Sequence, residues 1–228
     1  MSHYEKAWQD VLRRIAAAER AAGRAPGSVQ LLAVSKTFPA EAVRAVHAAG
    51  QRAFGENYVQ EAVAKRAALA DLPGIAWHLI GPLQSNKTAP AAAAFDWVET
   101  VDRAKVAQRL SAQRPEGMAA LDVCIEVNVS GEATKGGVPP AEAPALAAAV
   151  AALPRLRLRG VMGIPAPTAD VRAQRAQFAA LRQCFERLRA AGHGVDTLSM
   201  GMSADLEAAI AEGATQVRVG TAIFGERT

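Results

Sequence analysis

The sequence predicts a single (β/α)8 barrel with an extra N-terminal helix, on three observations. Eight short apolar segments of strand character alternate with helical stretches, and eight is the strand count of such a barrel. No linker, repeat or change of composition divides the 228 residues, so we expect one domain over 1–228. The chain also opens with a helix and has only residues 221–228 after its last strand. An open doubly wound sheet is the alternative, although six or so strands are usual there.

The first element is an amphipathic helix near the N-terminus. Trp8, Val11, Leu12 and Ile15 recur at helical spacing, with charged residues on the other face. Because residues 221–228 are too few for a full helix after the last strand, the N-terminal helix is a candidate to cover that part of the barrel wall. This segment lacks the apolar stretch of a signal sequence. No segment is long and apolar enough to span a membrane, and we expect a soluble, cytoplasmic protein.

The strands and the remaining helices then follow in order. The eight predicted strands lie at 31–35, 52–55, 77–80, 97–101, 123–128, 156–162, 197–200 and 216–219. The stretches between them are predicted helices, and 171–189 has the clearest apolar face. Gly50, Gly192 and Gly213 each follow a helical run, where glycine readily ends a helix.

The composition argues against several classes of function. The formal net charge is +4, and the basic residues are scattered, which is typical of solvated helix faces rather than of a nucleic-acid-binding surface. Cys124 falls in an apolar strand and Cys184 on the apolar side of a helix, at a spacing that fits no metal site. We therefore expect two buried thiols in a reducing compartment, and no metal, nucleic-acid or membrane partner.

Polar residues and glycines gather at the carboxyl ends of the predicted strands. A parallel barrel brings all these ends to one face, where active sites are built. Lys36 follows the first strand and shares a side with Leu32 and Val34, because alternate residues of a strand face the same way. If that side is the barrel interior, its partly desolvated amine is available to attack a carbonyl group. A surface lysine just beyond a strand is the open alternative.

Two loops near the C-terminus are candidate phosphate sites. The loop from Ser199 to Ser203 is predicted to open a helix over 204–211, whose first N–H groups and the Ser203 hydroxyl would bind an anion. Gly220 and Thr221 supply a second set of donors after the last strand. Barrels often hold phosphate on the loops after strands seven and eight, although Ser203 would serve equally as a simple helix cap.

A Schiff-base amine together with phosphate-binding loops is what a protein needs to bind pyridoxal 5'-phosphate (PLP). Arg218 is predicted to face the same side as the last loop, and a buried guanidinium needs an acceptor. That acceptor is either the ring nitrogen of PLP or a carboxylate such as Glu126 or Glu56. Asn57 and His78 are candidates to line the same mouth, although a single histidine is more often a core residue.

Six segments carry a resemblance to a known family. They are AVSK at 33–36, FGENYVQE at 54–61, HLIGPLQSNK at 78–87, GVMGI at 160–164, LSMGMSAD at 198–205 and VRVGTAIFG at 217–225. On these segments the chain resembles the YggS/PROSC family of PLP-binding, or PLP homeostasis, proteins. More distantly it resembles the N-terminal barrel domain of bacterial alanine racemases.

The resemblance implies a PLP-bearing barrel of the fold-type III class. Lys36 would form the Schiff base, Arg218 would face the ring nitrogen, and the two C-terminal loops would hold the phosphate. The implied cofactor-binding residues are Lys36, Asn57, Met200, Ser203, Arg218, Gly220 and Thr221. The family is associated with balanced intracellular vitamin B6 and amino-acid pools, and no firm catalytic activity is attached to it.

The sequence leaves three functions open. The leading hypothesis is a non-catalytic, monomeric PLP carrier that serves apo-enzymes, because an arginine at the ring nitrogen weakens PLP as an electron sink. The second is a PLP enzyme acting on amino acids, but the only tyrosines available as an opposed base are Tyr4 and Tyr58. The third is a class I aldolase that uses Lys36 on a phosphorylated carbonyl substrate. Lys135 and Lys87 are alternative amines.

Overall fold

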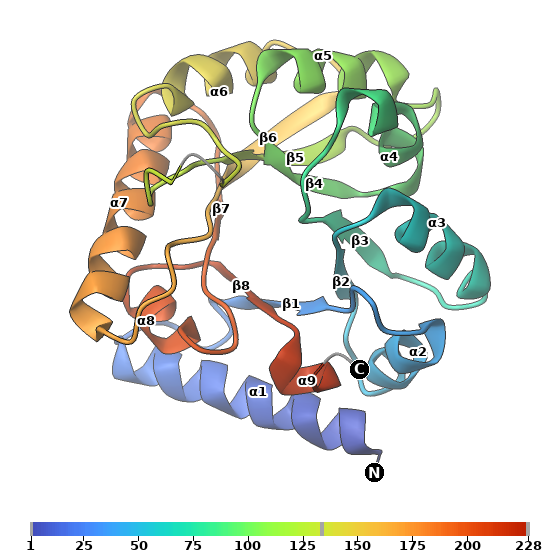
Figure 1. Ribbon diagram of the computed structural model, residues 1–228, viewed down its shortest axis with the longest axis vertical. Helices are drawn as coiled ribbons and strands as arrows, with labels where there is room; N and C mark the ends of the chain where they lie inside the picture. The colour runs from blue at the N-terminus through green and yellow to red at the C-terminus, as the bar shows by residue number, and fades with distance from the viewer. Residues whose placement is uncertain (1, 133–134, 227–228) are drawn as a thin grey trace.

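Eight parallel strands form a closed barrel in the computed structural model, which describes residues 2–132 and 135–226 (Figure 1). Each strand pairs with the next one along the chain, and β8 pairs with β1 to close the ring. The strands are β1 (Gln30–Val34), β2 (Ala53–Glu56), β3 (Ala76–Leu79), β4 (Trp97–Val101), β5 (Leu121–Glu126), β6 (Leu156–Met162), β7 (Thr197–Ser199) and β8 (Gln216–Val219). The closure confirms the predicted (β/α)8 barrel and excludes the open sheet.

The predicted strands are all present, and β5 departs most from its predicted bounds. It begins at Leu121 and ends at Glu126, two residues earlier at each end than 123–128. The reason is that the chain folds back after Glu126: Val127 pairs with Val138, whose N–H donates to Glu126 O at 2.9 Å. The loop after β5 therefore lies against the end of its own strand.

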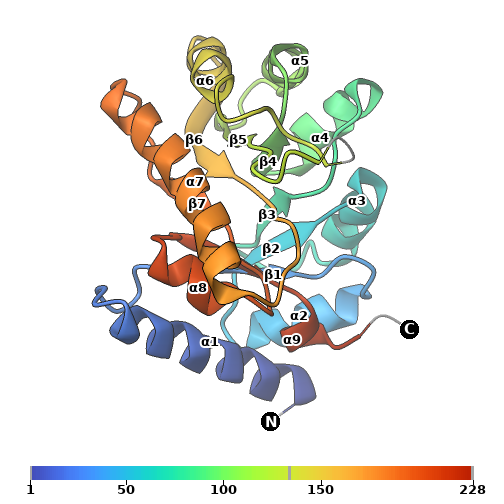
Figure 2. The ribbon, with the colours of Figure 1, turned by 60° about the vertical axis from the view of Figure 1, so that its left-hand side comes forward.

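Helices surround the strands on the outside of the ring (Figures 1 and 2). They are α1 (His3–Ala21), α2 (Ala40–Ala48), α3 (Val59–Ala68), α4 (Thr88–Ala94), α5 (Ala104–Gln113), α6 (Ala143–Ala151), α7 (Val171–Ala190), α8 (Leu206–Ala211) and α9 (Thr221–Phe224), with a 3-10 turn, η1 (Ser85–Lys87). The helix predicted over 204–211 begins only at Leu206. Asp205 accepts a 2.6 Å hydrogen bond from Met202 N and closes residues 202–205 into a turn, so Ser203 is not the helix cap.

Helix α1 covers the wall that the short α9 leaves bare, as the sequence predicted. A capping box between Ser2 and Glu5 fixes its start. Val11 and Ile15 are buried, and the helix packs against α2, α8 and α9 (Figure 2). Burial of this apolar face holds the first element of the chain against the last.

The core has two parts, separated by the strands. The larger part fills the space between strands and helices, and it includes Cys184. Cys124, a strand residue, is also buried, and both thiols are unbridged as expected. The smaller part consists of Leu32, Val34 and Ile80 inside the barrel. Among the described residues, no helix is long and apolar enough to cross a bilayer.

Candidate functional site

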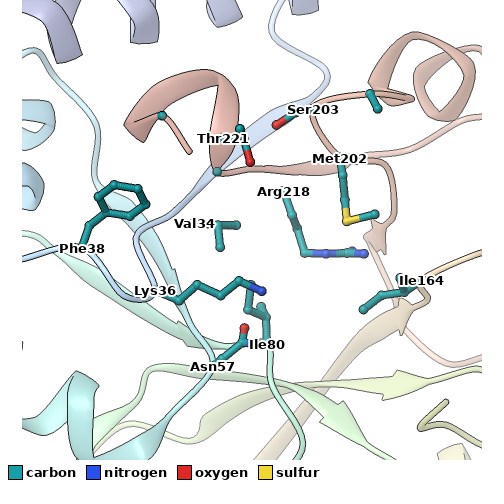
Figure 3. Close-up of a pocket in the computed structure, with 13 residues that line it drawn as sticks. Val34, Lys36, Phe38, Asn57, Ile80, Ile164, Met202, Ser203, Arg218 and Thr221 are labelled. Carbon is teal, nitrogen blue, oxygen red and sulfur yellow. The ribbon is translucent and has the colours of Figure 1, made fainter. Parts of the chain in front are cut away.

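A cavity of about 320 Å³ opens at the carboxyl ends of the strands, beside the small interior cluster. Lys36 reaches into it after β1, and Arg218 reaches into it from β8 (Figure 3). Predicted site residues that line it are Lys36, Asn57, Ser203, Arg218, Gly220 and Thr221. The cavity therefore joins side chains from both ends of the chain.

Lys36 lies in the turn that follows β1 and is half-buried. Val34, two residues earlier, lines the same cavity, as the alternation of strand side chains predicts. The other candidate amines are elsewhere: Lys135 donates to Pro165 O at 3.1 Å in the loop after β5, and Lys87 ends η1. Neither lines the cavity.

The two candidate phosphate loops meet at one edge of the cavity. Ala222 N donates to Ser203 Oγ at 3.4 Å, which links the loop after β7 to the loop after β8. Ser203 and Thr221 lie side by side there (Figure 3). Gly220 approaches β1 closely, since an added Cβ would lie 3.2 Å from Val34 O. A side chain at this position would require Val34 or the loop to shift by a few tenths of an ångström.

Arg218 is buried at the floor of the cavity, with 3% of its surface exposed. One guanidinium nitrogen donates to Ser199 Oγ at 2.7 Å, and the other donates to Gly163 O at 2.9 Å. Burial lowers the pKa of Arg218, and the nearby Glu99 carboxylate opposes that effect. A guanidinium stays charged at neutral pH nonetheless. With five N–H groups, it keeps donors for an acceptor in the cavity.

Arg218 contacts a hydroxyl group rather than the carboxylates that the sequence suggested as its partners. No carboxylate of the described residues lies within ion-pair distance of Arg218, Glu126 and Glu56 included. Ser199 instead accepts from Arg218 and donates to Glu99 Oε2 at 2.6 Å. Glu99 was absent from the sequence-based site, and Ser199 was expected only as the first residue of a phosphate loop. A glutamate inside an apolar strand such as β4 is nevertheless a sign of a buried polar contact.

Two predicted residues, His78 and Met200, do not line the cavity. His78 Nδ1 lies 2.7 Å from Glu99 Oε1, and its ring stacks on Trp97 at 4.9 Å. It is thus a core histidine, and Ile80, two residues further along the chain, lines the cavity instead. Met200 is fully buried in the outer core. Because Ser199 turns towards Arg218, the next residue must face the helices.

Asn57 gives a direct sign that this cavity accommodates a ligand. Its side-chain oxygen Oδ1 is buried and has no hydrogen-bond partner within the described residues. Buried acceptors are nearly always satisfied, and Asn57 lines the cavity. Together with the Arg218 cation at the floor, the unpartnered Asn57 oxygen fits an anionic, polar ligand that carries a hydrogen-bond donor.

The chain is similar to known proteins over nearly its whole length. The family model described as alanine racemase, N-terminal domain, matches residues 11–228. A pyridoxal phosphate homeostasis protein of Pseudomonas aeruginosa is 63% identical over 95% of this chain and 93% of its own length. Its counterpart in Escherichia coli K12 is 51% identical over 94% of this chain and 92% of its own.

A solved structure extends the comparison to a ligand. The structure of PipY from Synechococcus elongatus PCC7942, described as having PLP bound, is 42% identical to this chain, with a TM-score of 0.82. The match covers 92% of this chain and 100% of that one.

Proposed function

This chain belongs to the alanine racemase N-terminal domain family and, within it, to the pyridoxal phosphate homeostasis proteins, and we propose that it holds PLP on Lys36. The observation that carries the proposal is the convergence of one amine, one buried guanidinium and two phosphate-type loops on a single cavity. The relatives' names and the PLP-bound PipY support the cofactor. The physiological role is PLP homeostasis.

The chain's own residues divide the tasks of binding. The Lys36 amine attaches the cofactor as a Schiff base, and Arg218 donates to its ring nitrogen. Ser203, Gly220 and Thr221 bind the phosphate through hydroxyl and N–H groups. When bound, PLP supplies an aldehyde that reacts reversibly with amines and a ring that accepts electrons.

We further propose that the protein is a carrier rather than a robust enzyme. Arg218 keeps its own protons and leaves the ring nitrogen without one, which weakens the electron sink. Neither tyrosine supplies an opposed base in the cavity: Tyr58 is 57% exposed, and Tyr4 packs on Phe224 in the outer wall. In this proposal a cytoplasmic monomer, acting as one barrel domain, passes PLP to apo-enzymes.

An absorption experiment tests the attachment site. Wild type, Lys36→Ala and the matched control Lys87→Ala are incubated with PLP, passed through a desalting column and scanned. We expect wild type and the control to retain a visible band, and Lys36→Ala to lose it, because Lys36 is the only lysine among the described residues that lines the cavity. Borohydride reduction and mass mapping then locate the pyridoxyl group.

Two results would contradict the proposal. A pyridoxyl group on Lys135 or Lys87 would move the attachment to a loop amine. The absence of a band in wild type would remove PLP from the site and favour a phosphorylated carbonyl substrate on Lys36.

A further inference from the structure

The residues on both sides of Lys36 are tied to helix α3. Ser35 O accepts a 2.7 Å hydrogen bond from Lys65 Nζ, and Thr37 N donates to Glu61 Oε1 at 2.6 Å. Lys65 and Glu61 both belong to α3. The backbone of the Lys36 turn is therefore anchored to one helix before and after the lysine.

A single ammonium group joins these anchors. Lys65 is buried, with 6% of its surface exposed, and its Nζ donates at 2.7 Å to Ser35 O, Glu56 Oε1 and Glu61 Oε1. Ser35 Oγ also donates to Glu56 Oε1 at 2.6 Å. Because a buried lysine needs such acceptors, its position is determined by the three together.

The same turn stores backbone strain. Thr37 has φ +69°, the one positive value among the described non-glycine residues. A left-handed threonine costs on the order of 1–3 kcal/mol and persists only where its surroundings enforce it. Glu61 accepts the Thr37 N–H at 2.6 Å and so contributes to holding this conformation.

We propose that Lys65, through Glu61, is a positioning residue that aims the Lys36 amine into the cavity. The inference rests on the proposed function for its ligand, and it adds that α3 controls covalent attachment separately from phosphate and ring binding. Lys65 and Glu61 do not line the cavity themselves, so they act only through the turn.

The test compares two ligands that differ only at the reacting carbon. PLP has an aldehyde, whereas pyridoxine 5'-phosphate has an alcohol and binds without a covalent bond. In Lys65→Met and Glu61→Ala we expect PLP affinity to fall by about 10- to 100-fold, the range that misplacement of a reacting group causes. Affinity for pyridoxine 5'-phosphate, measured by calorimetry, should stay within about threefold of wild type.

Two control variants separate positioning from folding. Glu61→Gln keeps an oxygen for Thr37 N and should restore PLP affinity to within about threefold of wild type. Arg114→Met removes another buried cation, 3% exposed, that donates to Ala92 O and Phe95 O between α4 and α5. This variant should lose stability but keep PLP affinity.

A readout without PLP keeps the inference separate from the proposed function. Competitive acetylation of the ligand-free protein compares Lys36 with the exposed Lys105 as an internal reference. We expect the ratio of the two rates to change by at least about threefold in Lys65→Met and not in Arg114→Met. If wild type fails to bind PLP, the proposed function fails and this ratio alone decides the positioning role.

The inference is overturned by either of two outcomes. Equal losses for PLP and pyridoxine 5'-phosphate would show general damage to the cavity. Unchanged PLP affinity with an unchanged Lys36 labelling ratio would show that α3 does not control the amine.

Discussion

Glu126 shows how one side chain near the site titrates in an unusual range. Burial, reinforced by the negative charge of Asp102, raises its pKa from 4.5 to about 7, while Arg218 opposes the shift. The loop after β5 closes over it, since an added Cβ on Gly136 would lie 2.9 Å from Glu126 Oε1. This carboxyl group is therefore protonated in the folded protein at mildly acidic pH.

The raised pKa predicts how stability depends on pH. Between about pH 4.5 and 7 the folded protein holds a proton that the unfolded chain has lost, so the free energy of unfolding falls as pH rises through this window. Glu126→Gln removes that dependence. From pH 5 to pH 8, its free energy of unfolding relative to wild type should rise by on the order of 2 kcal/mol, measured by urea unfolding.

The matched control is Glu116→Gln, whose side chain is 93% exposed. Its difference from wild type should be the same at both pH values. A constant difference for Glu126→Gln as well would contradict the raised pKa.

The sequence predicted the site residues whose side-chain direction is set by strand alternation. It did not predict the residues whose place in the site depends on a partner far away in the chain. Lys36 and Arg218 follow from their strand positions. Glu99 lies 100 residues from its partner Ser199, and no local pattern shows that contact. The prediction for Met200 was wrong for a local reason. Met200 lies in the expected loop, but the side chain of its neighbour Ser199 points inward to Arg218, so that of Met200 points outward.

Helix α1 is the element whose energetic role is easiest to test. Ile15 is buried against the barrel wall and Lys6 on the same helix is exposed. Ile15→Ala should lower the free energy of unfolding by about 2–4 kcal/mol, because it leaves a cavity between packed elements. Lys6→Ala should change it by less than about 0.5 kcal/mol.

Urea unfolding of both variants measures this prediction. Equal, small effects would mean that α1 is docked too loosely to support the wall.

Element boundaries were predictable where apolar periodicity ends sharply, as at β4 and β6. The boundaries were not predictable where a side chain forms a hydrogen bond with the backbone and so favours a turn over the first turn of a helix. Asp205 takes the Met202 N–H and delays α8, and this choice between turn and cap is not visible in the order of residues.

At the scale of the whole molecule, ligand binding and folding are linked. A ligand that binds only the folded protein at about 100 times its Kd adds about 2.7 kcal/mol of stability. For a chain of this size the melting temperature should rise by about 5–10 °C with PLP. Thermal unfolding should show this rise in wild type and a much smaller one in Lys36→Ala.

The two proteins serve as each other's control, because free PLP in solution is identical in both experiments. An equal rise in the two would place the main binding energy outside the Lys36 attachment.

Closure of the barrel between β1 and β8 has a consequence for biosynthesis. Gln30 pairs with Gln216, and the cavity takes Lys36 from the start of the chain and Arg218 and Gly220 from its end. Contacts so distant in sequence form late in folding. A nascent chain on the ribosome thus exposes Lys36 for most of translation without a cavity around it, and the binding site exists only once the final strand has been released.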